Sequence, residues 1–164
     1  METVNLKMLK FTFVRFSKNR PIPYDLLLLA DPSREMIDSY LVDSDLYVAS
    51  ESGKVIGVVV LFPVDKETAE IKNLAVRPDH QGKGIGKWLL ENTIDIARRK
   101  HFKRLVIGTA NSSLHQLALY QKVGFKVYSL KRDFFVENYP DPIFENGMQA
   151  RDLVMLEFDL NREA

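Results

Sequence analysis

The sequence predicts an α/β fold with a mixed, mostly antiparallel central sheet of about seven strands flanked by helices. Short apolar or alternating segments between turn residues indicate strands along most of the chain. Two stretches change to the spacing of an amphipathic helix, and strands and helices alternate through residues 69–123. Because no repeat, low-complexity tract or Gly/Ser linker interrupts the 164 residues, we expect a single domain over residues 1–164.

The first third of the chain is predicted to hold a strand, two short helices and a β-hairpin. β-branched and aromatic residues favour the strand, and an Asp-Pro-Ser sequence is typical of the start of the second helix. A Ser-Gly pair between two apolar segments indicates the hairpin turn. The expected elements are a strand at 4–16, helices at 24–30 and 33–41, and hairpin strands at 46–49 and 55–62.

The next expected strand, at 68–76, carries an irregularity in its alternation. Ile71 has one parity, whereas Leu74 and Val76 have the other, so the apolar face changes sides. We therefore expect a β-bulge at residues 72–73.

The rest of the chain is predicted to alternate helices with strands. Apolar residues from Ile85 onward recur at helical spacing, and Gly124 is the expected end of a second helix. The expected elements are helices at about 84–100 and 114–123 and strands at 103–109, 125–130 and 152–160, the last two joined by an irregular segment.

Composition and charge disfavour several classes of protein. The 23 basic and 22 acidic residues give a formal charge of +1, too little for a nucleic-acid-binding surface. The absence of cysteine removes disulfides and thiolate metal sites and suits a reducing compartment, so we expect a cytoplasmic protein. No apolar stretch approaches the length of a membrane span, and no cluster of ligands has the spacing of a metal site, so we expect neither.

Three glycines within five residues stand at the predicted transition from the strand at 68–76 to a helix. Gly82, Gly84 and Gly86 would let a ligand approach the backbone closely and would expose successive N–H groups. The positive end of the helix dipole lies at the same place, so a pyrophosphate is the expected ligand. A glycine-rich turn without a ligand is the alternative, since short glycine motifs are common.

Two other nucleotide-binding motifs do not fit this spacing. A Walker A loop requires glycine where Gln81 stands and Ser or Thr where Trp88 stands. A dinucleotide-binding fingerprint that begins at Gly82 requires glycine where Lys87 stands. Both motifs are therefore disfavoured.

Two blocks of residues share their order and spacing with a known family. The first is Gln81-x-x-Gly84-x-Gly86 after the strand Ala-Glu-Ile-Lys-Asn-Leu-Ala-Val, and the second is Asn111, a helix containing Tyr120, and Gly124-Phe125. Together they resemble the GNAT superfamily of acyl-CoA-dependent N-acetyltransferases. The resemblance implies a GNAT-like fold, with an acyl-CoA core at about 46–130 and an acceptor-site loop at about 131–151.

The resemblance also implies roles for single residues toward acetyl-CoA, the expected co-substrate. Leu74, Ala75 and Val76 would bind the acyl and pantetheine arm through their backbone. Asn111 would hydrogen-bond the pantetheine, or else serve as a turn or N-cap residue. The residues that would hold the pyrophosphate are Gln81, Gly82, Lys83, Gly84, Ile85 and Gly86.

Two residues are candidates for the chemistry of acyl transfer. By resemblance, Tyr120 would face the thioester sulfur and act as its acid, the alternative being a core aromatic with a satisfied hydroxyl. Glu70 occupies the position where several family members carry the general base, the alternatives being a strand-surface ion pair or a water relay. Because the chain has no cysteine, we expect direct attack in a ternary complex rather than an acyl-enzyme.

The segment at 131–151 stands out by its acidic and aromatic residues. Residues 132–152 hold five carboxylates and two arginines, with four aromatic rings among them. If this segment forms the acceptor site, Glu137 and Glu145 would attract a cationic amine. Alternatively the charges are a surface feature and the rings fill the core or a homodimer interface.

The resulting hypothesis is an N-acetyltransferase that moves acetyl from acetyl-CoA to a primary amine of a small cationic molecule. A protein or peptide N-acetyltransferase is one alternative, and a non-catalytic acyl-CoA-binding module is another, which the presence of Tyr120 disfavours. The histidines, His80, His101 and His115, are expected to be surface residues.

Overall fold

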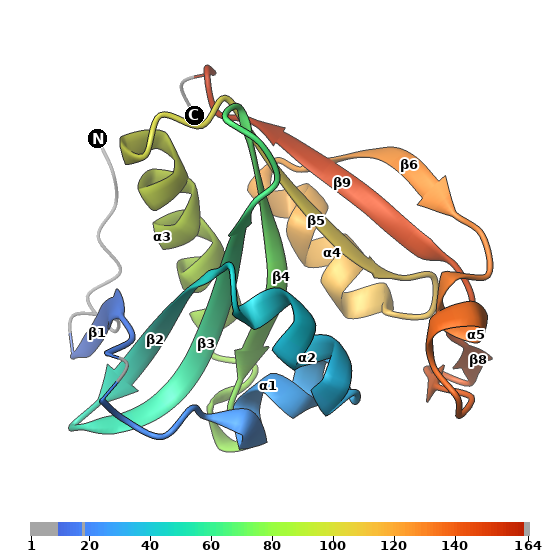
Figure 1. Cartoon of the computed structure of the whole chain (residues 1–164), viewed down its shortest axis with the longest axis horizontal. Helices are drawn as coiled ribbons and strands as arrows, with labels where there is room; N and C mark the ends of the chain where they lie inside the picture. The colour runs from blue at the N-terminus through green and yellow to red at the C-terminus, as the bar shows by residue number, and fades with distance from the viewer. Residues whose placement is uncertain (1–9, 18, 163–164) are drawn as a thin grey trace. The chain divides into compact units, whose positions relative to one another are not determined.

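A computed structural model of the chain describes residues 10–17 and 19–162 (Figure 1). The strands are β1 (Phe11–Arg15), β2 (Asp45–Glu51), β3 (Lys54–Pro63), β4 (Thr68–Val76), β5 (Arg104–Ala110), β6 (Lys126–Lys131), β7 (Phe144–Glu145), β8 (Met148–Gln149) and β9 (Leu153–Asp159). The helices are α1 (Tyr24–Ala30), α2 (Arg34–Leu41), α3 (Ile85–Arg99), α4 (Leu114–Val123) and α5 (Phe134–Asn138), with a 3₁₀ helix, η2, at Pro78–His80. Residues 4–9 of the expected first strand lie outside the described residues.

The predicted fold class is confirmed: helices flank a seven-stranded mixed sheet. The strand order is β1-β2-β3-β4-β5-β9-β6, and β7 and β8 form a separate ladder. The described registers of β1 with β2, β2 with β3, β5 with β9, and β6 with β9 are all antiparallel.

The chain divides into two compact units. The first consists of Met1–Pro63 and Ile71–Ile96, and the second of Val64–Glu70 and Ala97–Ala164. Strand β4 and helix α3 each contribute residues to both units. The single domain over residues 1–164 stays a prediction.

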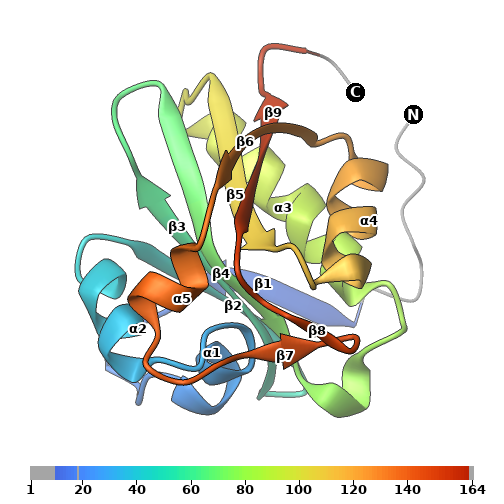
Figure 2. The ribbon, with the colours of Figure 1, turned by 90° about the vertical axis from the view of Figure 1, so that its right-hand side faces the viewer.

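In the first unit, α1 and α2 cover one face of β2 and β3, and α3 lies on the other face (Figures 1 and 2). Ser33 caps α2, since its hydroxyl accepts a hydrogen bond from the Met36 N–H at 3.1 Å, as the Asp-Pro-Ser sequence predicts. The face toward α1 and α2 is a buried apolar cluster of Leu26, Leu27, Ile37, Leu46, Val48, Val58, Val60 and Ala75.

Gly57 of β3 lies where helix α3 approaches the sheet closely. A Cβ at this position would lie 3.1 Å from Cδ1 of Leu89 and 3.3 Å from the carbonyl oxygen of Ala75. On the same helix Trp88 meets Phe13 of β1 edge-on, with 5.9 Å between ring centroids. Close packing therefore fixes the first turns of α3, directly after the glycine loop.

Strand β4 has an unbroken alternation of burial, which corrects the expected change of phase. Every odd position from Ala69 to Ala75 is buried. The apolar pattern is interrupted because the polar Asn73 occupies one of these buried positions, while Leu74 is half-buried. The Asn73 amide donates hydrogen bonds to the Leu27 carbonyl at 2.9 Å and the Tyr40 hydroxyl at 3.1 Å. The alternation therefore needs no bulge to explain it.

In the second unit, β9 lies between β5 and β6, and α4 packs along these strands (Figure 2). Helix α5 and the β7–β8 hairpin lie at the end where β9 begins. Phe125 follows α4 and is 2% exposed. Its ring centroid lies 6.3 Å from that of Tyr120 and 5.4 Å from that of Phe158. These aromatic rings form part of the core of the second unit.

The β7–β8 hairpin stands where the sequence analysis expects an irregular segment. Its turn is Asn146-Gly147, with φ of 54° and 74°. Asn-Gly is the dipeptide that two-residue hairpin turns favour, because both central residues need positive φ. This dipeptide was therefore the signal that could have revealed the hairpin.

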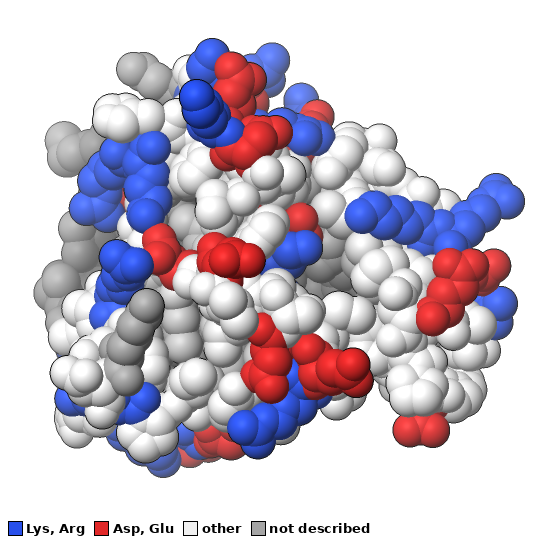
Figure 3. Space-filling view, viewed as in Figure 1, with Lys and Arg blue, Asp and Glu red and all other residues white. Residues whose placement is uncertain are grey.

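Charged side chains of both signs are interspersed on the face drawn in Figure 3. This distribution agrees with the formal charge of +1 for the whole chain. Within residues 10–17 and 19–162, no helix is both long enough and apolar enough to cross a membrane.

Candidate functional site

The glycine loop lies between the end of β4 and α3 in the first unit, as the sequence predicts, and the 3₁₀ helix η2, which was not predicted, precedes it. Gly82 and Gly84 have φ of 75° and 82°, a region that residues with a Cβ rarely adopt. A Cβ at Gly82 would find no heavy atom within 4 Å, so the outer side of the loop is open. Helix α3 begins at Ile85, and the first N–H groups of a helix have no partner within it. The loop thus has the backbone features of an anion site.

Gln81, the first residue of the predicted pyrophosphate loop, is bound within the protein. Its N–H donates to the Pro78 carbonyl at 3.3 Å, and its Nε2 donates to the Val76 carbonyl at 3.0 Å. Gly82, Lys83 and Gly84 follow and are exposed. We therefore expect the N–H groups that bind an anion to begin at Gly82.

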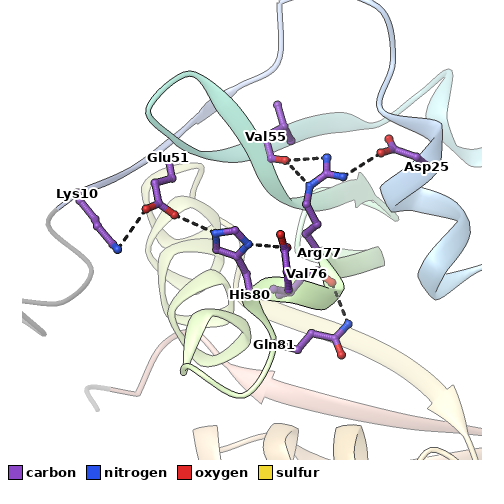
Figure 4. A network of polar contacts seen from close by, with 9 residues as sticks. Lys10, Asp25, Glu51, Val55, Val76, Arg77, His80 and Gln81 are labelled. Atoms are coloured by element: carbon purple, nitrogen blue, oxygen red, sulfur yellow. Dashed lines mark hydrogen bonds and ion pairs between the residues drawn. The ribbon is translucent and has the colours of Figure 1, made fainter.

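His80 is held between two carboxylates, which corrects its expected surface role (Figure 4). Its Nδ1 lies 2.7 Å from Oδ1 of Asp79, and its Nε2 lies 2.9 Å from Oε2 of Glu51. The second oxygen of Glu51 contacts Nζ of Lys10 at 3.2 Å. The hydrogen bonds from His80 are the first cause of the lowered pKa of both Glu51 and Asp79.

The other two histidines, His101 and His115, are exposed, as predicted. Among the side chains that the structure describes, no group of three or more His, Asp or Glu is arranged to hold a metal ion.

Arg77 fastens the end of β4 to β3 (Figure 4). Its guanidinium donates two hydrogen bonds to the Val55 carbonyl, at 3.0 and 2.9 Å, and one to the Asp25 carboxylate at 3.2 Å. Its backbone N–H donates to the Ile56 carbonyl at 2.7 Å. The chain is therefore fixed in place immediately before η2.

The β4 residues expected at the acyl arm differ in exposure. Ala75 is buried in the core cluster, so a ligand would meet only its backbone. Leu74 and Val76 are half-buried, and the Val76 carbonyl already accepts the Gln81 side chain. Glu70, the candidate base, is half-buried and has the same parity along β4 as Leu74.

Tyr120 lies on α4 in the second unit and is 5% exposed. Among the described residues, none is hydrogen-bonded to its hydroxyl. Burial raises the pKa of the phenol, and the negative charge of Glu145 raises it further. The phenol therefore keeps its proton at neutral pH, and Glu145 is close enough to act on it.

The β7–β8 hairpin is fastened to the turn before α4 by three side-chain hydrogen bonds. They join Ser113 Oγ to Glu145 Oε2 (2.9 Å), Asn146 Nδ2 to the Ser112 carbonyl (2.7 Å) and Asn111 Nδ2 to the Gln149 carbonyl (3.2 Å). The Glu145 carboxylate is thereby placed at the N-terminus of the helix that carries Tyr120. The Asn-Gly dipeptide could have revealed the hairpin, but not this placement, because the bond from Ser113 to Glu145 joins residues 32 positions apart.

The side-chain amide of Asn111 makes three hydrogen bonds within the second unit. Its Oδ1 accepts hydrogen bonds from the N–H groups of Arg151 at 2.8 Å and Asp152 at 3.1 Å. Its Nδ2 donates to the Gln149 carbonyl, and a primary amide has a second N–H. The Asn111 side chain thus ties the turn before α4 to residues 149–152, and one donor is left for a ligand.

The remaining residues of the acidic segment have mixed environments. Glu137 is exposed on α5. Phe135 packs against Phe134 and Tyr139, with ring centroids 5.2 and 5.6 Å apart, while Phe144 is 67% exposed. Three of the four rings therefore form a small cluster of their own.

The buried Tyr120 and the half-buried Tyr40 predict a loss of stability at alkaline pH. Burial raises the pKa of Tyr40 and Tyr120 above the ordinary value, which is about 10 in an unfolded chain. Above about pH 10 the unfolded state therefore binds fewer protons than the native state, so stability falls as pH rises. Thermal unfolding from about pH 7 to about pH 11.5 should show this fall, with a smaller slope for Tyr120→Phe. An equal slope for the variant and the wild type would contradict the assignment.

Comparisons with known proteins decide the family. The model of the acetyltransferase (GNAT) family matches residues 13–125. The chain belongs to this family. As a GNAT acetyltransferase it is an acyl-CoA-dependent enzyme. It is 47% identical over 137 residues to the uncharacterized N-acetyltransferase YvbK of Bacillus subtilis, covering 84% of this chain and 88% of that one.

Two solved structures share both the fold and much of the sequence. A GNAT family acetyltransferase from Elizabethkingia anophelis with acetyl-CoA bound is 49% identical, with a TM-score of 0.91 over 92% of this chain and 99% of that chain. The IAA acetyltransferase of Bacillus cereus is 44% identical, with a TM-score of 0.87 over 91% of this chain and 99% of that chain.

Proposed function

We propose that this GNAT acetyltransferase transfers acetyl from acetyl-CoA to the primary amine of a small cationic molecule, by direct attack in a ternary complex. The open glycine loop before α3 supports acetyl-CoA as the donor. The Glu145 carboxylate at the start of the Tyr120 helix supports a cationic amine as the acceptor. The acetyl-CoA bound to the Elizabethkingia relative supports the choice of donor.

The donor would be bound largely by backbone groups. The N–H groups from Gly82 to Gly86 would take the pyrophosphate, with the exposed Lys83 adding positive charge. Leu74 and Val76 are half-buried, and their backbone would meet the acyl and pantetheine arm through groups other than the Val76 carbonyl, which accepts Gln81 Nε2. The second N–H of Asn111 would donate to a pantetheine carbonyl.

The transfer forms one C–N bond and breaks one C–S bond. The lone pair of the neutral amine attacks the thioester carbonyl carbon, and the tetrahedral intermediate expels the thiolate of CoA. The nitrogen loses a proton and the sulfur gains one, which gives the acetamide and the free thiol. An alkyl ammonium has a pKa near 10, so a further proton must leave before attack at neutral pH.

Tyr120 would act on the sulfur mainly as a hydrogen-bond donor. Burial raises the pKa of its phenol, whereas a thiol has a pKa of about 8.5. Complete transfer of the phenolic proton to the thiolate is therefore unfavourable unless the amine nitrogen resupplies it. A hydrogen bond that strengthens as charge develops on the sulfur needs no such transfer and lowers the barrier.

Glu70 is the proposed base for the ammonium of the acceptor, directly or through a water. Its half-buried position on β4 gives it the same parity as Leu74, whose backbone is proposed to meet the acyl arm. A carboxylate is a much weaker base than an amine, so a water relay that delivers the proton to solvent is compatible with this role.

Glu145 would hold the cationic acceptor next to Tyr120. Its carboxylate is half-buried, accepts a hydrogen bond from Ser113 and influences the Tyr120 phenol. Partial burial strengthens its attraction for a cation because solvent screens it less. Glu137 is exposed on α5, so its contribution should be smaller.

Replacing each glutamate should therefore raise the KM of the acceptor, and the increase should be larger for Glu145 than for Glu137. Glu145→Gln should raise the KM of a polyamine acceptor by about tenfold, the effect of losing one partly desolvated charge pair, and leave the KM of acetyl-CoA unchanged. Glu137→Gln should raise the KM of the polyamine less than threefold. Added salt should reduce the difference in this KM between each variant and the wild type. Steady-state kinetics at two salt concentrations would test this. Equal KM values for all three proteins would remove Glu145 from the acceptor site.

The function itself is tested by the release of free thiol from acetyl-CoA in the presence of an amine panel. The panel should contain polyamines, aminoglycoside-like compounds, basic peptides and IAA, after which the Bacillus cereus relative is named. Turnover with small cationic amines supports the proposal, and turnover with peptides alone supports a protein or peptide N-acetyltransferase. CoA binding without turnover on any member of the panel would place the acceptor outside these classes and overturn the proposed substrate. A cytoplasmic location and a homodimer stay predictions.

A further inference from the structure

The glycine loop has little of its own to hold its shape. Gly82 and Gly84 have positive φ and lack side chains, and Gly82 has no neighbour where a Cβ would stand. A glycine backbone loses more conformational freedom on ordering than any other. The loop must therefore be fixed from its two ends if it is to meet a ligand in one conformation.

The C-terminal end is fixed by packing. Ile85 is 1% exposed, and Leu89 on the next turn is fully buried. The Trp88 N–H donates to the Gly84 carbonyl at 3.1 Å, which starts the hydrogen-bond ladder of α3.

Arg77 and Gln81 hold the N-terminal end, and His80, the last residue of η2, adds a further link. The ring bridges its sequence neighbour Asp79 and Glu51, which is 29 positions earlier in the chain at the end of β2. The side chain of His80 is only 17% exposed, although Asp79 is 62% exposed. The bond to Glu51 is thus the tertiary link, and the bond to Asp79 is a local one.

Charged groups of both signs surround this ring. Both ring nitrogens lie within hydrogen-bond distance of a carboxylate oxygen, and both can donate only when the ring carries two protons. Lys10 contacts Glu51 at 3.2 Å, and Lys54 at the start of β3 acts on Asp79. Figure 4 shows Glu51 and Lys10 beside the ring, and Asp79 and Lys54 complete this mixed cluster of charged groups.

We propose that His80 is a positioning residue for acetyl-CoA: by bridging Glu51 and Asp79 it holds the start of the glycine loop in the conformation that binds the pyrophosphate. This inference rests on the proposed role of the loop. His80 would not touch the ligand itself. Its contribution is to order the loop before binding. The free energy of CoA binding is then not spent on ordering the loop.

Two amide substitutions separate the bonds that His80 makes. His80→Gln places an amide N–H near the position of Nε2 and keeps the link to Glu51. His80→Asn places one near the position of Nδ1 and keeps only the local bond to Asp79. His80→Ala removes both, and His101→Asn is the matched control, since His101 is exposed and has a φ of 68° that asparagine tolerates.

Calorimetric titration with CoA, together with the KM of acetyl-CoA and kcat, provides the test. His80→Ala and His80→Asn should each raise the Kd of CoA and the KM of acetyl-CoA by about five- to tenfold with kcat at the wild-type value. His80→Gln should stay within about twofold of the wild type, as should His101→Asn. Glu51→Gln should weaken binding in the same direction as His80→Asn.

The outcomes separate this inference from the proposed function of the loop. If Gly84→Val abolishes CoA binding while His80→Ala binds like the wild type, the positioning role is overturned and the loop remains the binding site. If neither variant changes CoA binding, the loop is not the site and the proposed function fails with it. If His80→Ala and His80→Gln lose affinity equally, the link to Glu51 is not what orders the loop, and the inference is again overturned.

Discussion

Replacing Gly84 by valine should abolish acetyl-CoA binding at concentrations that saturate the wild type. Gly84 has a φ of 82°, a conformation that costs a residue with a Cβ about 1–2 kcal/mol. A valine side chain would also keep the pyrophosphate from the N–H groups, each of which contributes about 1.5–3 kcal/mol as a charge-assisted bond. The loss of two such bonds raises Kd by roughly 10²- to 10⁴-fold. Titration calorimetry with CoA and acetyl-CoA measures this loss.

Gly147 offers a matched control for the backbone strain. It has a φ of 74°, and a Cβ there would meet no heavy atom within 4 Å. Gly147→Val should therefore be strained to a similar degree while leaving CoA affinity near that of the wild type. Circular dichroism and thermal unfolding establish that both variants fold. Wild-type CoA affinity in folded Gly84→Val would remove the glycine loop from the donor site.

The order of helices and strands could be predicted because it depends on local patterns. The N-cap at Ser33 and the turn at Ser52-Gly53 are dictated by short-range hydrogen bonds and by backbone freedom. Gly82 and Gly84 likewise have the positive φ that an anion-binding turn requires. These features involve residues close together in the chain, so sequence alone contains the information.

The features that sequence analysis missed depend on tertiary contacts. The alternation of β4 was misinterpreted at Asn73, because burial of an amide there is offset by hydrogen bonds to Leu27 and Tyr40, far away in the chain. His80 was assigned to the surface because its bond to Glu51 joins residues 29 positions apart. No periodicity reveals such pairs.

The candidate site residues show the same contrast between local sequence signals and long-range contacts. Tyr120 and Asn111 could be proposed from the spacing of a motif, but the bonds that occupy Asn111 come from the segment around Gln149 and Asp152. Glu145 could be proposed from charge alone. Its place at the start of α4 depends on the Asn-Gly turn and on the bond to Ser113.

Replacing Tyr120 by phenylalanine should lower kcat by about 10² or more and leave the Kd of acetyl-CoA almost unchanged. The hydroxyl is proposed to act where charge develops on the sulfur, so its contribution appears in the transition state rather than in binding. Because burial keeps the pKa of the phenol raised, the wild-type rate should not fall through ionisation of Tyr120 below about pH 10. Steady-state kinetics with a saturating amine, together with CoA titration, provide the measurement.

Stability separates this chemical role from a packing role. No described residue is hydrogen-bonded to the Tyr120 hydroxyl, so Tyr120→Phe should unfold within about 0.5 kcal/mol of the wild type or be slightly more stable. Tyr40 is the control, since it is half-buried and bonds Asn73 and Asp31 at 3.1 and 3.3 Å. Tyr40→Phe should lose about 1–3 kcal/mol of stability while keeping kcat. A Tyr120→Phe variant that turns over like the wild type with a good acceptor would make Tyr120 a core aromatic and nothing more.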